Sequence, residues 1–277
     1  MIRRQITVSC PGVMAADSSC ARAAITSPPA EPERSQARPD KPRQHLSFLL
    51  FEGMTALDFL GPATVLTASG QFAVDYVWRD KNPVYAESSV DKCLGFMPTA
   101  TFGEIRETDI LCVPGTSNPY APIMQEDILE WVGNVGSRAE WVTSVCTGSF
   151  ILGAAGLLKG YRATTHWTMV EELTYFGAEP VSDRVVRDRN RVTGAGVTSG
   201  IDFGLVLLAL LCGENTARQA QLMLEYDPDP PFVGGSPKNA APEMIAKCKT
   251  QFLSNRERNM PYAENVLYST AVRLGVI

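Results

Sequence analysis

The sequence predicts an α/β fold in which a mostly parallel β-sheet is covered by helices on both faces. The first observation is that apolar runs of strand length alternate with stretches of helix length over about 180 residues, a pattern typical of parallel sheets. The second is the segment 141–155, where five residues of strand-favouring composition end at Cys146 and pass directly into an apolar stretch. A strand, a sharp turn and a helix in this order form a nucleophile elbow.

Composition narrows the class of protein. The 277 residues are 45% hydrophobic and 20% charged, which suits a water-soluble protein with one large domain or two small ones. The net charge of -5 argues against a surface that holds nucleic acid or an anionic membrane. No segment reaches the roughly 18 to 20 apolar residues of a transmembrane helix. Seven scattered cysteines without a Cys-x-x-Cys pair indicate neither a disulfide framework nor a zinc site, so we expect a reducing, cytoplasmic compartment.

Residues 1–44 read as a disordered N-terminal extension. They hold six prolines and no apolar periodicity, so they bury too little surface to offset the entropy of ordering. Arg3 and Arg4 raise the alternative of an organelle-targeting peptide, but Asp17 and Glu31 do not fit the acid-poor composition of such peptides.

Hydrophobic patterning predicts the elements of the first half of the chain. His45–Phe51 is a nearly continuous apolar run, as in a central parallel strand. Alternation predicts the next strand, and prolines and glycines predict an irregular hairpin after it. In chain order we expect strands at 45–51, 72–78 and 109–113, a helix that ends near residue 69, an irregular hairpin over 83–99 and a helix over 121–136.

The second half continues the alternation. Two strands joined across Arg189 and Asn190 form an expected hairpin, and the proline-rich segment 227–232 interrupts the pattern. The expected elements are a strand at 141–145 with a helix after the elbow, a strand at 161–167 running into a helix over 168–176, paired strands at 184–188 and 191–195, and helices over 201–211, 214–225, 241–254 and 261–274.

Cys146 is the candidate nucleophile. A side chain on the elbow projects above the edge of the sheet, where the free N–H groups of the new helix favour a thiolate and lower the pKa of the cysteine. The alternative is a small buried hydrophobe at the end of a strand. The segment by itself leaves both interpretations open.

Other polar residues follow the ends of the buried strands. Asp58 lies near the start of the first helix, where an acidic residue more often serves as a cap or a dipole partner. The loop Pro114–Asn118 lies at the carboxyl end of a parallel strand, where such sheets place ligands, and its N–H groups suit an oxyanion hole or an ordinary turn. His166, one of two histidines, lies at a strand-to-helix junction beside Trp167, in a catalytic or a structural role. Neither a Rossmann fingerprint nor a Walker phosphate loop is present.

Six short motifs between residues 45 and 237 resemble those of one superfamily. They are Phe48–Phe51, Leu57–Pro62, Thr143–Ser149, Leu152–Leu158, Arg162–Trp167 and Gly200–Phe203. Together they are similar to the ThiJ/PfpI branch of the class I glutamine-amidotransferase-like superfamily. The run Leu224–Phe232, with Gly235, Ser236 and Pro237 after it, resembles in particular the isocyanide hydratases within that branch.

The resemblance implies a flavodoxin-like, three-layer α/β/α domain over residues 45–237, followed by a helical C-terminal tail over residues 238–277. It further implies a homodimer that acts on a small molecule, with no metal, no organic cofactor, no nucleic-acid partner and no membrane. These are expectations for the structure and the comparisons to test.

The resemblance also implies an activity, the hydration of isocyanides to N-substituted formamides through a thioimidate on the cysteine. In such enzymes the elbow cysteine, here Cys146, is the nucleophile, and the acid after the first strand, here Asp58, is the acid and base. We place four further residues at the substrate or oxyanion site and keep His166 as another candidate. The four are Thr147, Gly115, Thr116 and Val197.

Two positions depart from the pattern. Relatives commonly carry a glycine where this chain has Thr116, and a glycine-rich run where it has Ala195. A threonine preserves the backbone N–H geometry only where the native φ is accessible to it. Both departures lie near the expected pocket, so they bear on the identity of the substrate.

Three alternative functions remain. A glyoxalase or deglycase of the same superfamily carries a histidine directly after the cysteine, where this chain has Thr147. AraC-type regulators carry a similar domain but continue into DNA-binding helices, whereas 45 residues follow Phe232 here. The third is a binding scaffold, such as a non-DNA-binding relative of those regulators, that kept the elbow and lost hydration activity.

Overall fold

The computed structural model describes residues 43–87 and 94–277. The strands are β1 (Gln44–Leu49), β2 (Phe72–Trp78), β3 (Val84–Tyr85), β4 (Gly95–Phe96), β5 (Ala100–Thr101), β6 (Ile110–Val113), β7 (Trp141–Val145), β8 (Arg162–Ala163), β9 (Glu179–Pro180), β10 (Val185–Asp188) and β11 (Arg191–Gly194). The helices are α1 (Ala56–Thr67), α2 (Glu126–Gly136), α3 (Gly148–Ala154), α4 (Ser199–Cys212), α5 (Glu214–Met223), α6 (Pro242–Asn259) and α7 (Ala263–Arg273), with the 3-10 segments η1 (Pro122–Met124) and η2 (Val170–Phe176). Residues 1–42 of the predicted disordered extension lie outside the described residues, and its last residue, Gln44, is instead the first residue of β1, where it pairs with Phe72 of β2.

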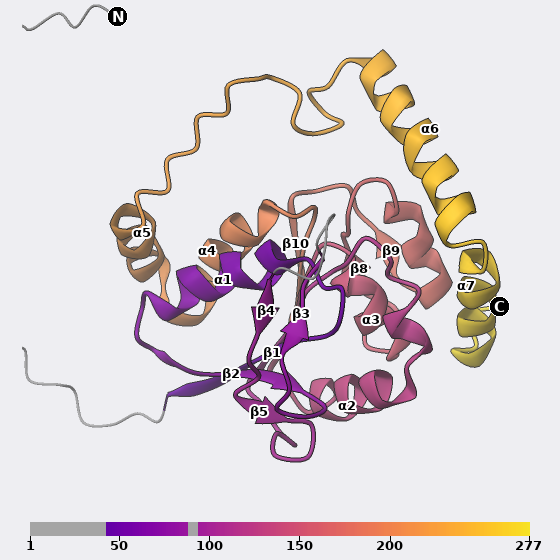
Figure 1. The fold of residues 1–277 in the computed structure, drawn as a ribbon. Coiled ribbons are helices and arrows are strands. Elements are labelled where there is room, and N and C mark those ends of the chain that lie inside the picture. The colour runs from indigo at the N-terminus through magenta and orange to yellow at the C-terminus, as the bar shows by residue number, and fades with distance from the viewer. Residues whose placement is uncertain (1–42, 88–93) are drawn as a thin grey trace, which may run out of the picture. The chain divides into compact units, whose positions relative to one another are not determined.

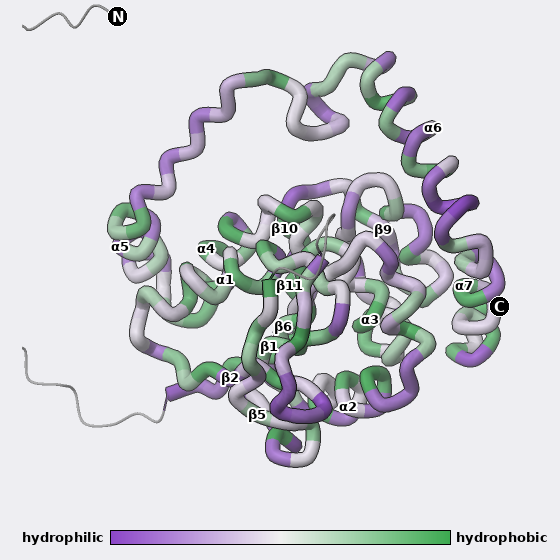
Figure 2. Tube along the Cα trace, viewed as in Figure 1, coloured by the Kyte–Doolittle hydropathy of each residue, from purple (hydrophilic) through white to green (hydrophobic). Residues whose placement is uncertain are grey.

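The main sheet confirms the predicted α/β fold. Its strands lie in the order β10-β11-β7-β6-β1-β2-β5, and every neighbouring pair is parallel except β10 and β11. Figure 1 shows α1 and α4 on one face of the sheet and α2 and α3 on the other. The central strands are largely green in Figure 2 because both of their faces are covered, and Phe48 and Leu111 are fully buried.

Helices α1 and α4 pack closely against each other. A Cβ on Gly204 of α4 would lie 3.0 Å from the Val65 Cβ and 3.1 Å from the Pro62 Cα of α1, so a larger residue there would require the two helices to shift. The loop before α1 is tied to the end of β6, since the Thr55 N–H donates to the Gly115 carbonyl at 2.8 Å. These contacts hold the start of α1 at the carboxyl edge of the sheet.

Two predicted helices differ in the structure. The helix expected over 121–136 is divided into η1 and α2, because Gln125 adopts an extended conformation between them. The helix expected over 168–176 is the 3-10 segment η2, which ends where Gly177 takes a φ of 70°. The short strands β5 and β9 were not predicted, since two-residue strands leave no hydrophobic period.

The C-terminal residues form the two expected helices, and α6 extends to Asn259, beyond the predicted end at residue 254. Leu267 of α7 is buried, whereas α6 has no buried residue. The link between α6 and η2 is an ion pair in which Arg256 Nη1 lies 2.8 Å from Glu172 Oε1. The division into a domain over residues 45–237 and a separate tail over residues 238–277 stays a prediction.

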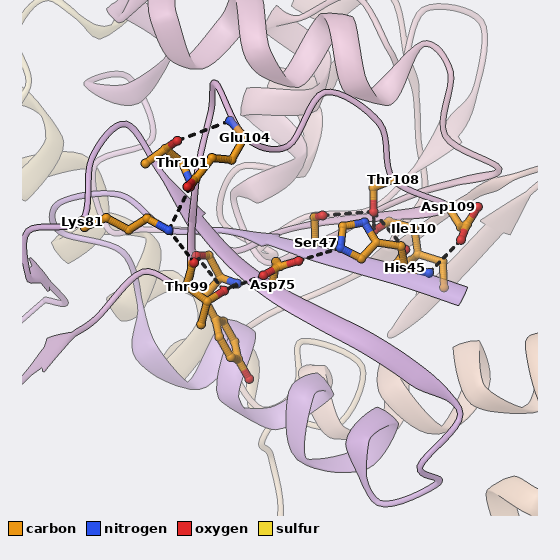
Figure 3. A network of polar contacts seen from close by, with 11 residues as sticks. His45, Ser47, Asp75, Lys81, Thr99, Thr101, Glu104, Thr108, Asp109 and Ile110 are labelled. Carbon is orange, nitrogen blue, oxygen red and sulfur yellow. Dashed lines mark hydrogen bonds and ion pairs between the residues drawn. The ribbon is translucent and has the colours of Figure 1, made fainter. Parts of the chain in front are cut away.

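Polar contacts join His45, near the start of β1, to Asp75 in the middle of β2, and Figure 3 shows the network continuing to Lys81 and Glu104. His45 Nε2 lies 2.6 Å from Asp75 Oδ2, and the His45 N–H donates to Asp109 Oδ2 at 2.7 Å. Thr99 Oγ1 donates to the other oxygen of Asp75 at 2.8 Å. Because β1 runs from His45 towards Leu49, His45 lies at the edge of the sheet away from Cys146 and is outside the candidate site.

Candidate active site

Cys146 occupies the turn between β7 and α3. It adopts a φ of 56°, one of three non-glycine residues with positive φ in the described chain, and its N–H donates to the Gly194 carbonyl at 3.0 Å. Its own carbonyl accepts hydrogen bonds from the Thr165 and Ser149 hydroxyls at 2.9 and 3.2 Å. A left-handed backbone at a buried non-glycine residue is strained, so these contacts hold the thiol in one position. The predicted elbow is present.

Gly148 makes this turn possible. A Cβ at this position would lie 2.1 Å from the carbonyl oxygen of Val113, closer than any side chain tolerates. The turn after Cys146 therefore packs directly on the end of β6. The glycine two residues after the cysteine is required by this close approach and not by its own φ, which is not in the left-handed region.

Asp58 is fully buried in the first turn of α1. The Gly115 N–H donates to its Oδ2 at 2.9 Å. Thr55 occupies the N-cap position of α1, and no side chain caps that helix, so the interpretation of Asp58 as a cap is wrong. Its Oδ1 makes no hydrogen bond within the described residues, although the carboxyl lies close enough to the Cys146 thiol for the two groups to shift each other's pKa.

Burial dominates the electrostatics of this pair. It raises the pKa of Asp58 to about 7, against the lowering effects of the Gly115 N–H and the Cys146 thiol, and the charge of Glu87 raises it further. The pKa of Cys146 is also raised, first by burial and then by the charge of Asp58; the Thr147 N–H lowers it by less. The expectation that backbone N–H groups give this cysteine a lowered pKa is therefore wrong, because desolvation outweighs them.

At neutral pH the resting pair is consequently a thiol beside a carboxyl group that is near half ionisation. A carboxylate with a pKa near the working pH suits both proton removal and proton donation. The arrangement provides a nucleophile and a base that exchange one proton.

Gly115, Thr116 and Thr147 lie together beside this pair, as predicted. The Thr116 N–H donates to Thr147 Oγ1 at 2.8 Å, and this hydroxyl donates back to the Thr116 carbonyl at 2.6 Å. A Cβ on Gly115 would lie 2.5 Å from the Thr147 nitrogen and 2.9 Å from Asp58 Oδ2. Glycine is therefore required at 115, while the φ of Thr116 is not in the left-handed region and is accessible to threonine.

These bonds reduce the number of backbone N–H groups in this loop that are free to bind an oxyanion. The N–H groups of Gly115 and Thr116 already donate to Asp58 and to Thr147. The Thr147 N–H, by contrast, acts on the Cys146 sulfur, where it lowers the pKa of the thiol. We regard it as the strongest oxyanion candidate in the described chain.

A cavity of about 470 Å³ opens beside Cys146. His166 and Val197 both line it, as does Thr147, so the structure brings every predicted site residue except Gly115 and Asp58 to its wall. The His166 ring hydrogen bonds to the Thr168 hydroxyl at 2.8 Å, and burial lowers its pKa. Nδ1 of the ring is therefore engaged with Thr168, and burial disfavours the charged form of the imidazole.

Besides Thr55 and Met169, sequence reasoning missed two larger parts of the cavity wall. One is Glu87, which lies in the predicted irregular hairpin and precedes the residues 88–93. The other is the end of α6, which contributes Phe252, Asn255 and Asn259, with Met260 after it. The tail carries no motif of the resemblance, so its only local signal was helical periodicity. Its approach to Cys146 is a tertiary contact.

Among the described residues there is no group of three or more His, Cys, Asp or Glu side chains placed to hold a metal ion. The described helices also include none long and apolar enough to cross a membrane.

Comparisons with known proteins agree with this geometry. A model of the DJ-1/PfpI family matches residues 44–210. The chain is 45% identical to an isonitrile hydratase of Pseudomonas putida over 74% of this chain and 88% of that enzyme. It is 27% identical to the HTH-type transcriptional regulator CdhR of Pseudomonas aeruginosa, over 64% of this chain and 53% of the regulator.

A solved structure is similar over nearly the whole described chain. The crystal structure of a ThiJ/PfpI family protein from Pseudomonas syringae superposes with a TM-score of 0.73 at 39% identity, covering 86% of this chain and 98% of that chain. With its elbow cysteine, mostly parallel sheet and family match, the chain belongs to the DJ-1/PfpI family.

Proposed function

We propose that this protein hydrates isocyanides to N-substituted formamides, with Cys146 as the nucleophile and Asp58 as the general acid and base. The observation that carries the proposal is the buried pair of Cys146 and Asp58, of which Cys146 lines a cavity of about 470 Å³. The similarity to an isonitrile hydratase supports the choice of substrate class.

The first half of the reaction uses the proton of the thiol. Asp58 takes this proton as the Cys146 sulfur bonds to the terminal carbon of the isocyanide, whose electron pair remains on that carbon. Asp58 then returns the proton to the same carbon, which yields the thioimidate. The pKa near 7 allows one carboxyl group to perform both transfers without a large energetic penalty.

Water completes the reaction. Asp58, ionised again, takes a proton from a water molecule as the water oxygen adds to the thioimidate carbon. Asp58 then passes that proton to the thioimidate nitrogen. Collapse of the resulting tetrahedral adduct breaks the carbon–sulfur bond, moves the hydroxyl proton to the departing sulfur through Asp58 and releases the formamide. The Thr147 N–H at the sulfur stabilises the thiolate as it leaves.

No observation favours the glyoxalase or deglycase alternative. The residue after the cysteine is Thr147, and its hydroxyl is engaged with the Thr116 backbone. His166 lines the cavity, and its Nδ1 is hydrogen bonded to the Thr168 hydroxyl. Among the hydrogen bonds of the described residues, none joins an imidazole to the Cys146 thiol.

The proposal is tested with purified protein and a panel of aryl and alkyl isocyanides, following formamide formation. Cys146→Ala and Asp58→Asn are each expected to reduce turnover to background, while Cys248→Ala, which changes an exposed cysteine on α6, serves as the control and retains it. A wild-type protein inactive on the whole panel that consumes methylglyoxal would contradict the substrate assignment and leave the fold unaffected.

We also propose a homodimer in the cytoplasm, as the resemblance implies. The mass of the native particle from light scattering tests the first part, and a monomer at micromolar concentration would exclude it. Fractionation of the host cell tests the second.

A further inference from the structure

Glu87 lines the cavity, yet the proposed reaction gives it no role. Its Oε1 accepts hydrogen bonds from the Thr116 hydroxyl at 2.9 Å and from the Ser117 N–H, and its Oε2 accepts one from the Thr55 hydroxyl at 2.9 Å. Its own N–H donates to the Met54 carbonyl at 2.8 Å. These bonds to the loops before α1 and after β6 hold the carboxylate in a fixed position at the cavity wall.

The charge of Glu87 is not balanced by any of these partners. All of them are hydroxyl or backbone N–H groups, which orient a carboxylate without neutralising it. Within residues 43–87 and 94–277, the cavity wall holds no lysine or arginine, and Glu87 is its only carboxylate. Burial lowers the pKa of His166, which lines the cavity, and so disfavours a positive charge on its ring.

The field of this carboxylate also reaches the reacting atoms. Glu87 is a cause of the raised pKa of Asp58 and of the raised pKa of Cys146. A substrate whose reactive carbon lies at the Cys146 sulfur therefore experiences the same negative potential.

We propose that Glu87 determines specificity by charge: the site takes isocyanides whose organic group is cationic or neutral and disfavours those whose organic group is anionic. The inference rests on the proposed function. The isocyanide group carries no net charge, so the organic group alone supplies the difference. For two unit charges across a partly solvated pocket we expect a preference on the order of tenfold between a cation and a neutral analogue, and again between the neutral analogue and an anion.

The test compares three small isocyanides: a protonated aminoalkyl isocyanide, an isocyanoacetate ester and the isocyanoacetate anion. Their kcat/KM values are measured for the wild type and for Glu87→Gln, whose amide oxygen still accepts from Thr116 or Ser117. We expect the ratio of cation to anion to fall at least tenfold in Glu87→Gln. Glu214→Gln, which changes an exposed residue on α5 outside the cavity, is the matched control and is expected to keep the wild-type ratio.

A change that only disturbed the loops would lower all three values together, so an unchanged ratio overturns the inference even if activity falls. A second measurement separates this result from failure of the proposed function. Alkylation of Cys146 by iodoacetamide and by iodoacetate, followed by mass spectrometry, reports the charge preference without any turnover of isocyanide. The ratio of the two rates is expected to move towards iodoacetate by about tenfold in Glu87→Gln. If the protein does not hydrate isocyanides but the alkylation ratio still shifts in Glu87→Gln, only the proposed function is contradicted. If the ratio shifts in neither assay, the role of Glu87 is contradicted.

Discussion

The Asp58 carboxylate and the Cys146 thiol act on each other with opposite signs. The charge of Asp58 raises the pKa of the thiol, whereas the hydrogen bond from the thiol lowers the pKa of Asp58. The two residues come from the first turn of α1 and from the turn after β7, 88 positions apart along the chain. Their protons are therefore lost as a coupled pair.

Removal of the carboxylate should separate these effects. Asp58→Asn is expected to lower the pKa of Cys146, because a negative neighbour is replaced by a neutral group. Catalysis should nevertheless fall by at least about a hundredfold, since the amide cannot accept and return a proton. The pH dependence of alkylation at Cys146 measures the first effect and formamide production the second. A thiol pKa that rises in this variant would contradict the coupling.

The activity should depend on pH through Asp58. Its pKa is raised to about 7, so it is protonated and inactive as a base below that pH, and kcat/KM should rise as pH increases through about 7. Glu87 contributes to the raised pKa, so Glu87→Gln should move the midpoint to lower pH for a neutral substrate. A profile measured between pH 5 and 9 checks both statements. A midpoint that does not move, or that moves upward, would exclude the effect of Glu87 on Asp58.

The same pKa affects stability. Because the folded pKa of Asp58 lies above the unfolded value, the stability that this residue contributes is fully present below about pH 4 and is lost as pH rises to about 7. Asp58→Asn does not titrate, so its Tm relative to the wild type should increase between pH 4 and pH 7, by an amount that corresponds to a few kcal/mol. Calorimetry across this range provides the measurement. A constant difference in Tm would show that Asp58 titrates normally.

Gly115→Ala should damage the site directly. The new Cβ would approach the Thr147 nitrogen and Asp58 Oδ2 to less than 3.0 Å, and both are part of the proposed machinery. We expect activity to fall by at least about tenfold and the free energy of unfolding by about 1–3 kcal/mol. Gly103→Ala is the control, because a Cβ there meets only the Thr101 hydroxyl at 3.9 Å. Equal behaviour of the two variants would contradict the steric argument.

The ion pair between Arg256 and Glu172 should affect substrate binding in the cavity by holding the end of α6 in place. Both side chains are mostly buried, Glu172 also accepts a hydrogen bond from the Tyr120 hydroxyl at 2.7 Å, and the pair joins α6 to η2. Arg256→Gln should release the end of α6, raising KM for bulky isocyanides several-fold with a smaller effect on kcat, because the reacting atoms are unchanged.

Hydrogen exchange within α6 should increase in Arg256→Gln, and the double variant with Glu172→Gln should be no worse than the single one. An unchanged KM together with unchanged exchange would show that the ion pair does not hold α6 over the cavity.

Local sequence determined the elbow and most of the sheet. The strand β7, Cys146 and Gly148 lie within eight consecutive residues, so the elbow was predicted from local sequence alone, whereas the role of Cys146 as a nucleophile was left open by this segment. The buried strands β1 and β6 were also predicted from local sequence, because a short continuous apolar run is typical of a parallel strand that is covered on both faces. The Cys146–Asp58 pair required in addition the resemblance to a known family, because the residues themselves are equally typical of a cap and a core cysteine.

Only the tertiary structure decided the electrostatics and the outer wall of the site. Burial, which no local pattern measures, reverses the expected direction of the Cys146 pKa. Glu87 and Asn255 reach the cavity from an irregular hairpin and from the C-terminal tail, 168 positions apart. Contacts at such separation depend on how every intervening element packs, whereas hydrophobic periodicity describes only the nearest few residues. This is why the sequence predicted the elbow but not the residues that form the outer wall of the cavity.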